Sequence, residues 1–175
     1  MIGTTGYNST QLSSISSAAK QIPILLSPNT SLSVNVLFKV SQMVAKLLSD
    51  FEVEIVESHH RYKKDAPSGT ALRLGQAIAS ARGHDFNAVA NFNRTGSENK
   101  VRPQEEIGFS VVRGGDIVGK HVTSFISDGE ELSLTSEITN RRSFAMGALL
   151  AAKFISSCKP GLFNMDHALG INGIT

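Results

Sequence analysis

The sequence lacks most of the features that would place the protein outside an ordinary globular fold. It has a single cysteine, Cys158, which excludes an internal disulfide framework and is typical of a reducing compartment. Its longest uninterrupted apolar run, residues 145–152, is far too short to cross a bilayer. The first residues also lack the basic and then apolar pattern of a secretory signal. We therefore expect a soluble, cytoplasmic protein with no membrane partner.

An excess of one charge is absent as well. Lys and Arg number 17 and Asp and Glu number 15, so the formal net charge is only +2. A charge this small does not favour nucleic acid or an anionic membrane as a partner. No Gly-x-Gly-x-x-Gly turn follows a strand anywhere in the chain, so the pyrophosphate-binding turn of a complete Rossmann domain is missing. A length of 175 residues fits one domain, or one domain with part of another.

Hydrophobic periodicity predicts a chain of mixed α/β and α+β character. Apolar residues recur at helical spacing over residues 9–20, 34–49, 70–82 and 143–156. Apolar or alternating runs predict strands at residues 22–26, 52–57, 107–113, 116–126 and 132–138. The turn at Gly3–Gly6, the first helix and strand 22–26 form a Rossmann-like piece, and the later strands form one sheet faced by helices. Residues 87–103 are polar and irregular and predict a long loop, with a turn at Arg94-Thr95-Gly96.

The chemistry of the chain is concentrated in residues 57–72, which read as a strand end, a polar loop and the start of a helix. Ser68, Gly69 and Thr70 stand where the first helical N–H groups have no partner inside the helix. Gly69 allows close approach to the main chain and the flanking hydroxyls add donors, so this turn suits a carboxylate or a phosphate.

Ionisable side chains precede that turn. His59 and His60 titrate near neutrality, and Lys63 can pair with an anion or give up a proton. An acidic substrate fits this set. Three plainer readings remain open: the Ser-Gly-Thr turn as a simple helix cap, Lys63 or Lys64 as solvated charge, and His121 as a structural residue. A metal site is not expected, because the chain has one cysteine and no second histidine at ligand spacing.

The run His59-His60-Arg61-Tyr62-Lys63-Lys64-Asp65-Ala66-Pro67-Ser68-Gly69-Thr70-Ala71 closely resembles the signature of the 4-hydroxy-tetrahydrodipicolinate reductase family of lysine and diaminopimelate biosynthesis. The resemblance extends to Gly3-Thr4-Thr5-Gly6, to Ser27-Pro28-Asn29 and to the segment from Arg113 to Gly119, in the family's order. It covers nearly the whole chain but only the later part of the family's sequence. It therefore implies a truncated chain whose early Rossmann half is missing.

The resemblance implies an architecture in which a mixed-sheet domain is inserted into a dinucleotide-binding domain. Residues 1–29 and 141–175 would form a remnant of the Rossmann domain, and residues 30–140 the substrate-binding and oligomerisation domain of a homotetramer. NADH or NADPH would be the cofactor. Its nicotinamide end would contact Gly3, Thr4, Thr5, Ser27, Pro28, Asn29 and Thr30, although the family more often has Phe where Thr30 stands.

The resemblance also implies a mechanism, the reduction of 4-hydroxy-tetrahydrodipicolinate, through its dehydrated form, to tetrahydrodipicolinate. His59 would donate and accept a proton and Lys63 would donate one. The cyclic dicarboxylate would be bound by His60, Ser68, Gly69 and Thr70. Two alternatives stay open. The chain could be an impaired fragment that binds the dicarboxylate and oligomerises but cannot hold the dinucleotide, or a metal-dependent phosphate-ester hydrolase that uses the His pair.

Overall fold

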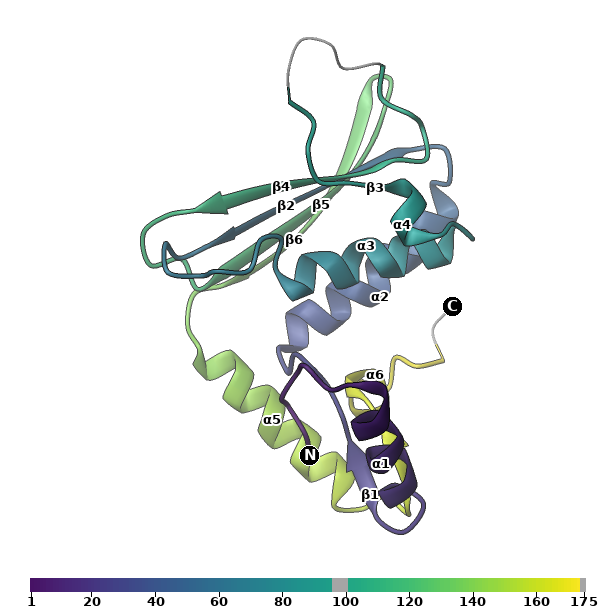
Figure 1. Ribbon diagram of the computed structural model, residues 1–175, viewed down its shortest axis with the longest axis vertical. Helices are drawn as coiled ribbons and strands as arrows, with labels where there is room; N and C mark the ends of the chain where they lie inside the picture. The colour runs from purple at the N-terminus through teal and green to yellow at the C-terminus, as the bar shows by residue number, and fades with distance from the viewer. Residues whose placement is uncertain (96–100, 174–175) are drawn as a thin grey trace. The chain divides into compact units, whose positions relative to one another are not determined.

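Figure 1 shows the computed structural model of the chain, which describes residues 1–95 and 101–173. The chain divides into two compact units, one formed by Met1–Asn35 with Arg141–Thr175 and the other by Val36–Asn140. We call these the terminal unit and the sheet unit. The predicted assignment of dinucleotide binding to residues 1–29 and 141–175, and of substrate binding to residues 30–140, stays a prediction.

The terminal unit is built on a parallel pair of strands. The order of its elements is α1 (Ser9–Ala18), β1 (Pro23–Leu25), α5 (Arg142–Ile155), β7 (Gly161–Phe163) and α6 (Met165–Leu169). Strand β1 pairs with β7, and Ile2 forms a further parallel bridge with Leu26. The predicted strand–helix–strand start is therefore present, because α1 joins two parallel extended segments. Leu25, Ala151 and Met165 form the buried core of this unit.

The sheet unit contains a five-stranded mixed sheet with strand order β3-β4-β2-β5-β6. Its strands are β2 (Glu52–His59), β3 (Ala90–Asn91), β4 (Ile107–Arg113), β5 (Gly119–Ser127) and β6 (Glu130–Ile138). Its helices are α2 (Leu32–Leu47), which starts in the terminal unit, α3 (Gly69–Ala81) and the short α4 (Phe86–Val89). Strand β2 pairs parallel with β4 and antiparallel with β5, as expected for a mixed sheet.

Helices α2 and α3 lie along one face of this sheet (Figure 1). Val53 and Ile55 of β2 and Phe125 of β5 are fully buried, as are Leu74 and Ile78 of α3. A Cβ atom at Gly75 would lie 2.5 Å from the ring of Phe109, so the glycine permits this close approach of α3 to β4. Burial of these apolar side chains, at about 1.5–3 kcal/mol each, fixes which face of β2 points inward.

Two of the predicted segments differ most from the structure. Strand β5 begins at Gly119 rather than at residue 116, because the Arg61 N–H donates to Gly115 O and turns that segment towards residues 59–61. The expected loop 87–103 overlaps α4, which the Asp85 side chain caps, and contains β3, which pairs with the edge of β4. Gly96, part of the predicted turn, lies outside the described residues. Within those residues no helix has the length and apolar character needed to cross a membrane.

Candidate active site

The alternation of strand β2 places two polar residues on its buried face. Val53 and Ile55 point inward, and with a side-chain period of two the next inward positions are Glu57 and His59. Glu57 is 1% exposed and His59 8% exposed, while Val56, between Ile55 and Glu57, faces outward. The apolar first half of the strand therefore carries an ionisable pair into the protein at its second half.

The buried carboxylate of Glu57 accepts four hydrogen bonds. Its Oε1 accepts from the Ser68 N–H at 2.9 Å and from an Arg113 Nη at 2.7 Å. Its Oε2 accepts from the other Arg113 Nη at 2.8 Å and is 2.5 Å from the Nδ1 of His59. These contacts use the roughly four lone-pair positions that a carboxylate offers, so the group is fully satisfied. The bidentate arginine offsets the cost of burying the charge.

Two pKa values in this pair are displaced from their ordinary range. Burial alone would raise the pKa of Glu57, but the hydrogen bonds from Arg113, from His59 and from the Ser68 amide together lower it below the usual value. Burial also lowers the pKa of His59, and the hydrogen bond to Glu57 partly opposes that effect. Glu57 is therefore ionised and acts only as an acceptor, so the Nδ1 of His59 carries the proton in their contact.

The second ring nitrogen of His59 faces Gly119. The register of β2 and β5 pairs Ser58 with Lys120, which brings His59 beside Gly119 at the strand end. A Cβ atom at Gly119 would lie 3.1 Å from the Nε2 of His59, which is tighter than ordinary van der Waals contact. Glycine at this position therefore leaves the Nε2 side of the imidazole uncrowded.

Helix α3 begins beside the same cluster. Ser68 is its N-cap, and its Oγ accepts from the Ala71 N–H at 3.2 Å. The same oxygen is 3.0 Å from the Nε2 of His121, whose ring lies edge-on to that of His59 with centroids 5.1 Å apart. Burial and the nearby charge of His59 lower the pKa of His121 to about 4. His121 is therefore neutral near pH 7, and its Nε2 shares a hydrogen bond with the hydroxyl of Ser68.

Three of the four predicted substrate residues, Ser68, Gly69 and Thr70, stand at this helix start. Gly69 is exposed and an added Cβ atom there would meet nothing within 4 Å, and Thr70 occupies the next position of the helix. The Nδ1 of His60 is buried and has no hydrogen-bond partner among the described residues. Both polar groups of Ser68 are engaged inside the protein, so its contact with a carboxylate stays a prediction.

Lys63 lies in the loop between β2 and α3. Its Nζ donates to the Asp65 carboxylate at 2.9 Å, and this hydrogen bond is the main cause of the lowered pKa of Asp65. Arg113 also donates to the Asp65 main-chain oxygen at 2.7 Å, so one guanidinium holds both this loop and Glu57. The structure thus places the predicted proton donor Lys63 on the loop that joins His59 to the start of α3.

Glu57, His59 and His121 could together offer three ligand atoms to a metal, all within 4.8 Å of one another. Their contacts argue against that use. The Glu57 carboxylate already accepts four hydrogen bonds, two of them from a guanidinium that would repel a cation. The sequence showed no second histidine at ligand spacing, but the fold brings one: His121 of β5 lies beside His59.

The residues expected to hold the nicotinamide end of a cofactor lie in the terminal unit. The Ile2 N–H donates to Leu25 O, and the Ser27 N–H donates to Ile2 O at 3.0 Å. Gly3–Thr5 and Ser27–Thr30 therefore follow the carboxyl ends of two adjacent parallel segments, where open α/β sheets bind ligands. Thr30 is buried and its hydroxyl donates to the Phe144 main-chain oxygen. Contact of this group with a dinucleotide stays a prediction.

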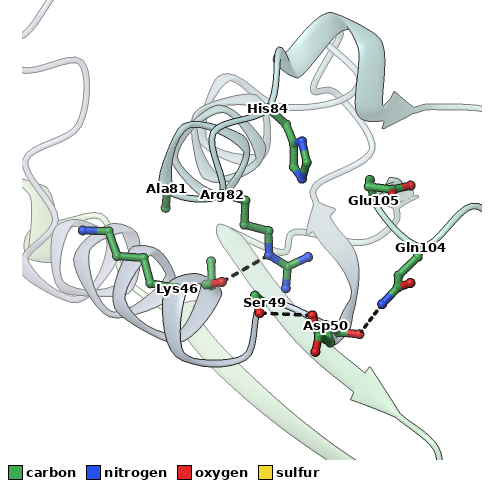
Figure 2. A pocket seen from close by; sticks show the side chains of 9 residues that line it. Lys46, Ser49, Asp50, Ala81, Arg82, His84, Gln104 and Glu105 are labelled. Atoms are coloured by element: carbon green, nitrogen blue, oxygen red, sulfur yellow. Dashed lines mark hydrogen bonds between the residues drawn. The ribbon is translucent and has the colours of Figure 1, made fainter.

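A cavity of about 440 Å³ lies in the sheet unit at the other end of α3 (Figure 2). Arg82 lines it, and the guanidinium donates to the main-chain oxygens of Ala45, Leu48 and Phe51 at the end of α2. The Gln104 amide donates to the main-chain oxygen of Asp50, and the neighbouring Ser49 hydroxyl donates to the Asp50 carboxylate (Figure 2). None of the predicted site residues lines this cavity.

Three residues of the cluster were not predicted as site residues: Glu57, Arg113 and His121, the last of which was expected to be structural. The signal for Glu57 was present, because it stands in phase with Val53 and Ile55 and a buried carboxylate needs a cationic partner. The signal for Arg113 was weaker, since only the pairing of β4 with β2 brings the end of one strand beside the other.

The fold and the cluster define a class of protein before any relative is considered. A mixed α/β chain carries a buried Glu–His pair, a nearby lysine and an exposed helix start, a combination suited to binding an anion and moving protons. The chain belongs to the dihydrodipicolinate reductase family: the family model "Dihydrodipicolinate reductase, C-terminus" matches residues 33–169.

Individual relatives agree with this membership. The chain is 48% identical to the 4-hydroxy-tetrahydrodipicolinate reductase of Citrifermentans bemidjiense over 172 residues, which cover 98% of this chain and 64% of that protein. It is 47% identical to the enzyme of the same name from Nitrosomonas europaea, with the same coverage. The chain thus spans slightly less than two thirds of the length of these curated relatives.

A solved structure shares the fold. It is the dipicolinate-bound dihydrodipicolinate reductase of Paenisporosarcina sp. TG-14, with a TM-score of 0.73 and 26% sequence identity. The similarity covers 93% of this chain and 61% of the other. The predicted fold class and family are therefore confirmed.

Proposed function

We propose that the chain carries the substrate-binding and proton-transfer part of an NAD(P)H-dependent 4-hydroxy-tetrahydrodipicolinate reductase, an enzyme of lysine biosynthesis. The observation that carries the proposal is the position of His59 beside the start of α3, with its Nδ1 held by Glu57 at 2.5 Å. The names of the relatives and the dipicolinate bound to the solved neighbour support the same substrate class.

The substrate in this proposal is a cyclic dicarboxylate. One carboxylate lies at Gly69 and Thr70, where helix α3 begins and its dipole is positive. The unpartnered Nδ1 of His60 offers a further polar contact. Lys63, which pairs with Asp65 in this structure, supplies a cation once a substrate carboxylate competes for it.

His59 and Lys63 handle protons during the reduction. Since the Nδ1 of His59 donates to Glu57, the Nε2 is the nitrogen that gives up or takes a proton at the substrate. Lys63 donates a proton from its ammonium. Bound NADH or NADPH supplies the hydride, and Gly3, Thr4, Thr5 and residues 27–30 would hold its nicotinamide end. The homotetramer and the cytoplasmic location remain predictions from the family resemblance.

Separate titrations test the proposal. Dipicolinate, NADH and NADPH are each titrated into the protein in a calorimeter. Oxidation of NADH or NADPH is then followed with 4-hydroxy-tetrahydrodipicolinate present. Binding of dipicolinate together with turnover is expected. Dipicolinate binding without nucleotide binding supports the impaired fragment instead. Hydrolysis of phosphate esters that needs added metal and no nicotinamide contradicts the proposal.

Thr70→Val refines the substrate site. Loss of the hydroxyl should weaken dipicolinate binding on the order of 10-fold, because hydrogen bonds to charged groups contribute about 1.5–3 kcal/mol. Thr139→Val, at an exposed position after β6, is the matched control and should leave the affinity unchanged. If both variants bind dipicolinate with equal affinity, the Thr70 hydroxyl does not contact the substrate and the turn at residues 68–70 serves only to cap the helix.

A further inference from the structure

We propose that Glu57 is a positioning residue for His59: its carboxylate fixes the Nδ1–H tautomer of the imidazole and, through the Ser68 amide, ties that imidazole to the start of helix α3. The inference rests on the proposed function, in which His59 exchanges a proton with the substrate. It adds a role for Glu57 and Arg113 that the predicted set of site residues lacks.

The first step is the fixed position of the carboxylate. Glu57 is 1% exposed, and its two oxygens accept from three different segments: the His59 ring on β2, the Ser68 amide at the start of α3 and the Arg113 guanidinium on β4. A side chain bonded on all sides has one conformation. The imidazole that donates to it is held with the same precision.

The second step is the role of Arg113. A buried carboxylate would take up a proton unless a cation kept it charged. Arg113 supplies that charge through two Nη contacts of 2.7 and 2.8 Å, and a third hydrogen bond carries it to Asp65 O in the loop of Lys63. Arg113 thus keeps Glu57 in its accepting form and also positions the lysine loop.

The third step is the consequence for His59. An ionised carboxylate can only accept, so the Nδ1 of His59 must be protonated. In neutral His59 the Nε2 then bears a free lone pair, and in charged His59 it bears the transferable proton. Gly119 leaves room on this Nε2 side, since any Cβ atom there would lie at 3.1 Å. The tautomer set by Glu57 is therefore the one the proposed reaction needs.

Burial is the largest cause of the lowered pKa of His59. Four groups also face its ring: Glu57 on its own strand, Arg113 on β4, His121 on β5 and Lys63 in the loop. Glu57 raises the pKa of His59, whereas Arg113 and Lys63 lower it, and His121 is neutral near pH 7. Removing Glu57 should therefore lower the pKa of His59. Removing Arg113 should lower it as well, because the Glu57 carboxyl then takes up a proton and this loss outweighs the direct repulsion by the guanidinium. A residue that only supported the fold would produce no such pattern.

Nitrogen NMR of histidine-labelled protein tests the proposal, with His59→Gln used to assign the signals. The wild-type protein should show the Nδ1–H tautomer at His59. In Glu57→Gln the new amide N–H faces the Nδ1, so the tautomer should switch to Nε2–H and the pKa should fall. In Arg113→Met the Glu57 carboxyl takes up a proton, so the pKa of His59 should also fall. Glu57→Asp should restore the wild-type tautomer, and Glu52→Gln, on the same strand but 43% exposed, should change nothing.

Kinetics separate this inference from the proposed function. Glu57→Gln should lower kcat at least about 100-fold with KM changed less than threefold, as expected for loss of one acid–base group. A wild-type Nε2–H tautomer, or a His59 pKa unchanged in Glu57→Gln, overturns the positioning role; the wild-type measurement holds even if the variant fails to fold. Unchanged turnover in His59→Gln overturns the proposed function and leaves the tautomer result standing.

Discussion

The two ends of helix α3 use an arginine in different ways. At the amino end Arg113 bonds a buried carboxylate, which in turn bonds His59 and the first amide of the helix region. At the carboxyl end Arg82 bonds three main-chain oxygens at the end of α2 and lines a cavity (Figure 2). The first arrangement couples ionisable groups to one another, and the second completes the hydrogen bonding of a helix end. The candidate site therefore differs from the cavity end of the helix in its coupled titrating groups.

The largest expected difference between the two ends is in turnover. His59→Gln and Lys63→Cys should each lower kcat about 10²- to 10⁴-fold, since each removes a proton-transfer group. Circular dichroism and NADH affinity should stay near wild type. His84→Gln and Lys46→Cys, which change the same residue types at the cavity, are the matched controls and should retain full activity. Wild-type activity in a His59→Gln, Lys63→Cys double variant would contradict the proton-transfer roles of both residues.

Stability should show the opposite contrast. Arg82→Met removes the donor to three main-chain oxygens, so the free energy of unfolding should fall by about 3–4 kcal/mol. The activity of the folded fraction should remain within about twofold of wild type. Urea unfolding, followed by assays at a temperature where the variant is folded, measures both quantities. A loss of activity per folded molecule would show that the cavity end takes part in catalysis.

Acid should lower the free energy of unfolding through His121, which lies beside the amino end of α3. Its pKa is about 4 in the folded protein against 6.5 for the ordinary group, so between these values the unfolded state binds more protons and stability falls as the pH drops. The full difference corresponds to about 3 kcal/mol, lost between about pH 6.5 and 4. Glu57, with its lowered pKa, adds a further loss below about pH 4.5.

Urea midpoints across this pH range check the effect. His121→Gln should flatten the dependence between pH 6.5 and 4, whereas His84→Gln at the exposed carboxyl end should leave the wild-type slope in place. Identical slopes in the wild-type and His121→Gln proteins would show that His121 is already charged in the folded state.

A smaller effect is expected from crowding the imidazole. Gly119→Ala adds a methyl group 3.1 Å from the Nε2 of His59, so kcat should fall about 10-fold as the ring shifts. Gly114→Ala, where an added Cβ atom meets nothing within 4 Å, is the control and should be neutral. Steady-state kinetics of both variants suffice, and equal rates would mean that the Nε2 of His59 does not need the space.

Periodicity was enough to predict the sheet and its helices, because their apolar spacing is regular. Strand β4 was predicted at its observed bounds, and β2 was placed correctly but ended two residues early, since Ser58 and His59 carry no apolar signal. The two-residue strand β3 and the single turn of α4 are too short for any period to show. Their formation depends on contacts made by the rest of the sheet unit.

The candidate site was predicted where its residues are continuous in sequence and missed where the fold assembles it. His59, Lys63 and the start of α3 stand within one motif. Arg113 lies on β4, 56 positions from its partner Glu57, and His121 lies on β5, 53 positions from its partner Ser68. The sequence offers no local pattern that pairs them, so only the folded strands show which groups they meet.

The central claim is that a dicarboxylate binds at the amino end of α3. Backbone amide NMR of the protein titrated with dipicolinate tests it most directly. The account predicts that the signals of Gly69, Thr70 and His60 shift with saturation while those of Arg82, His84 and Glu105 stay in place. Shifts confined to the Arg82 cavity, with the signals of Gly69 and Thr70 unmoved, would contradict it.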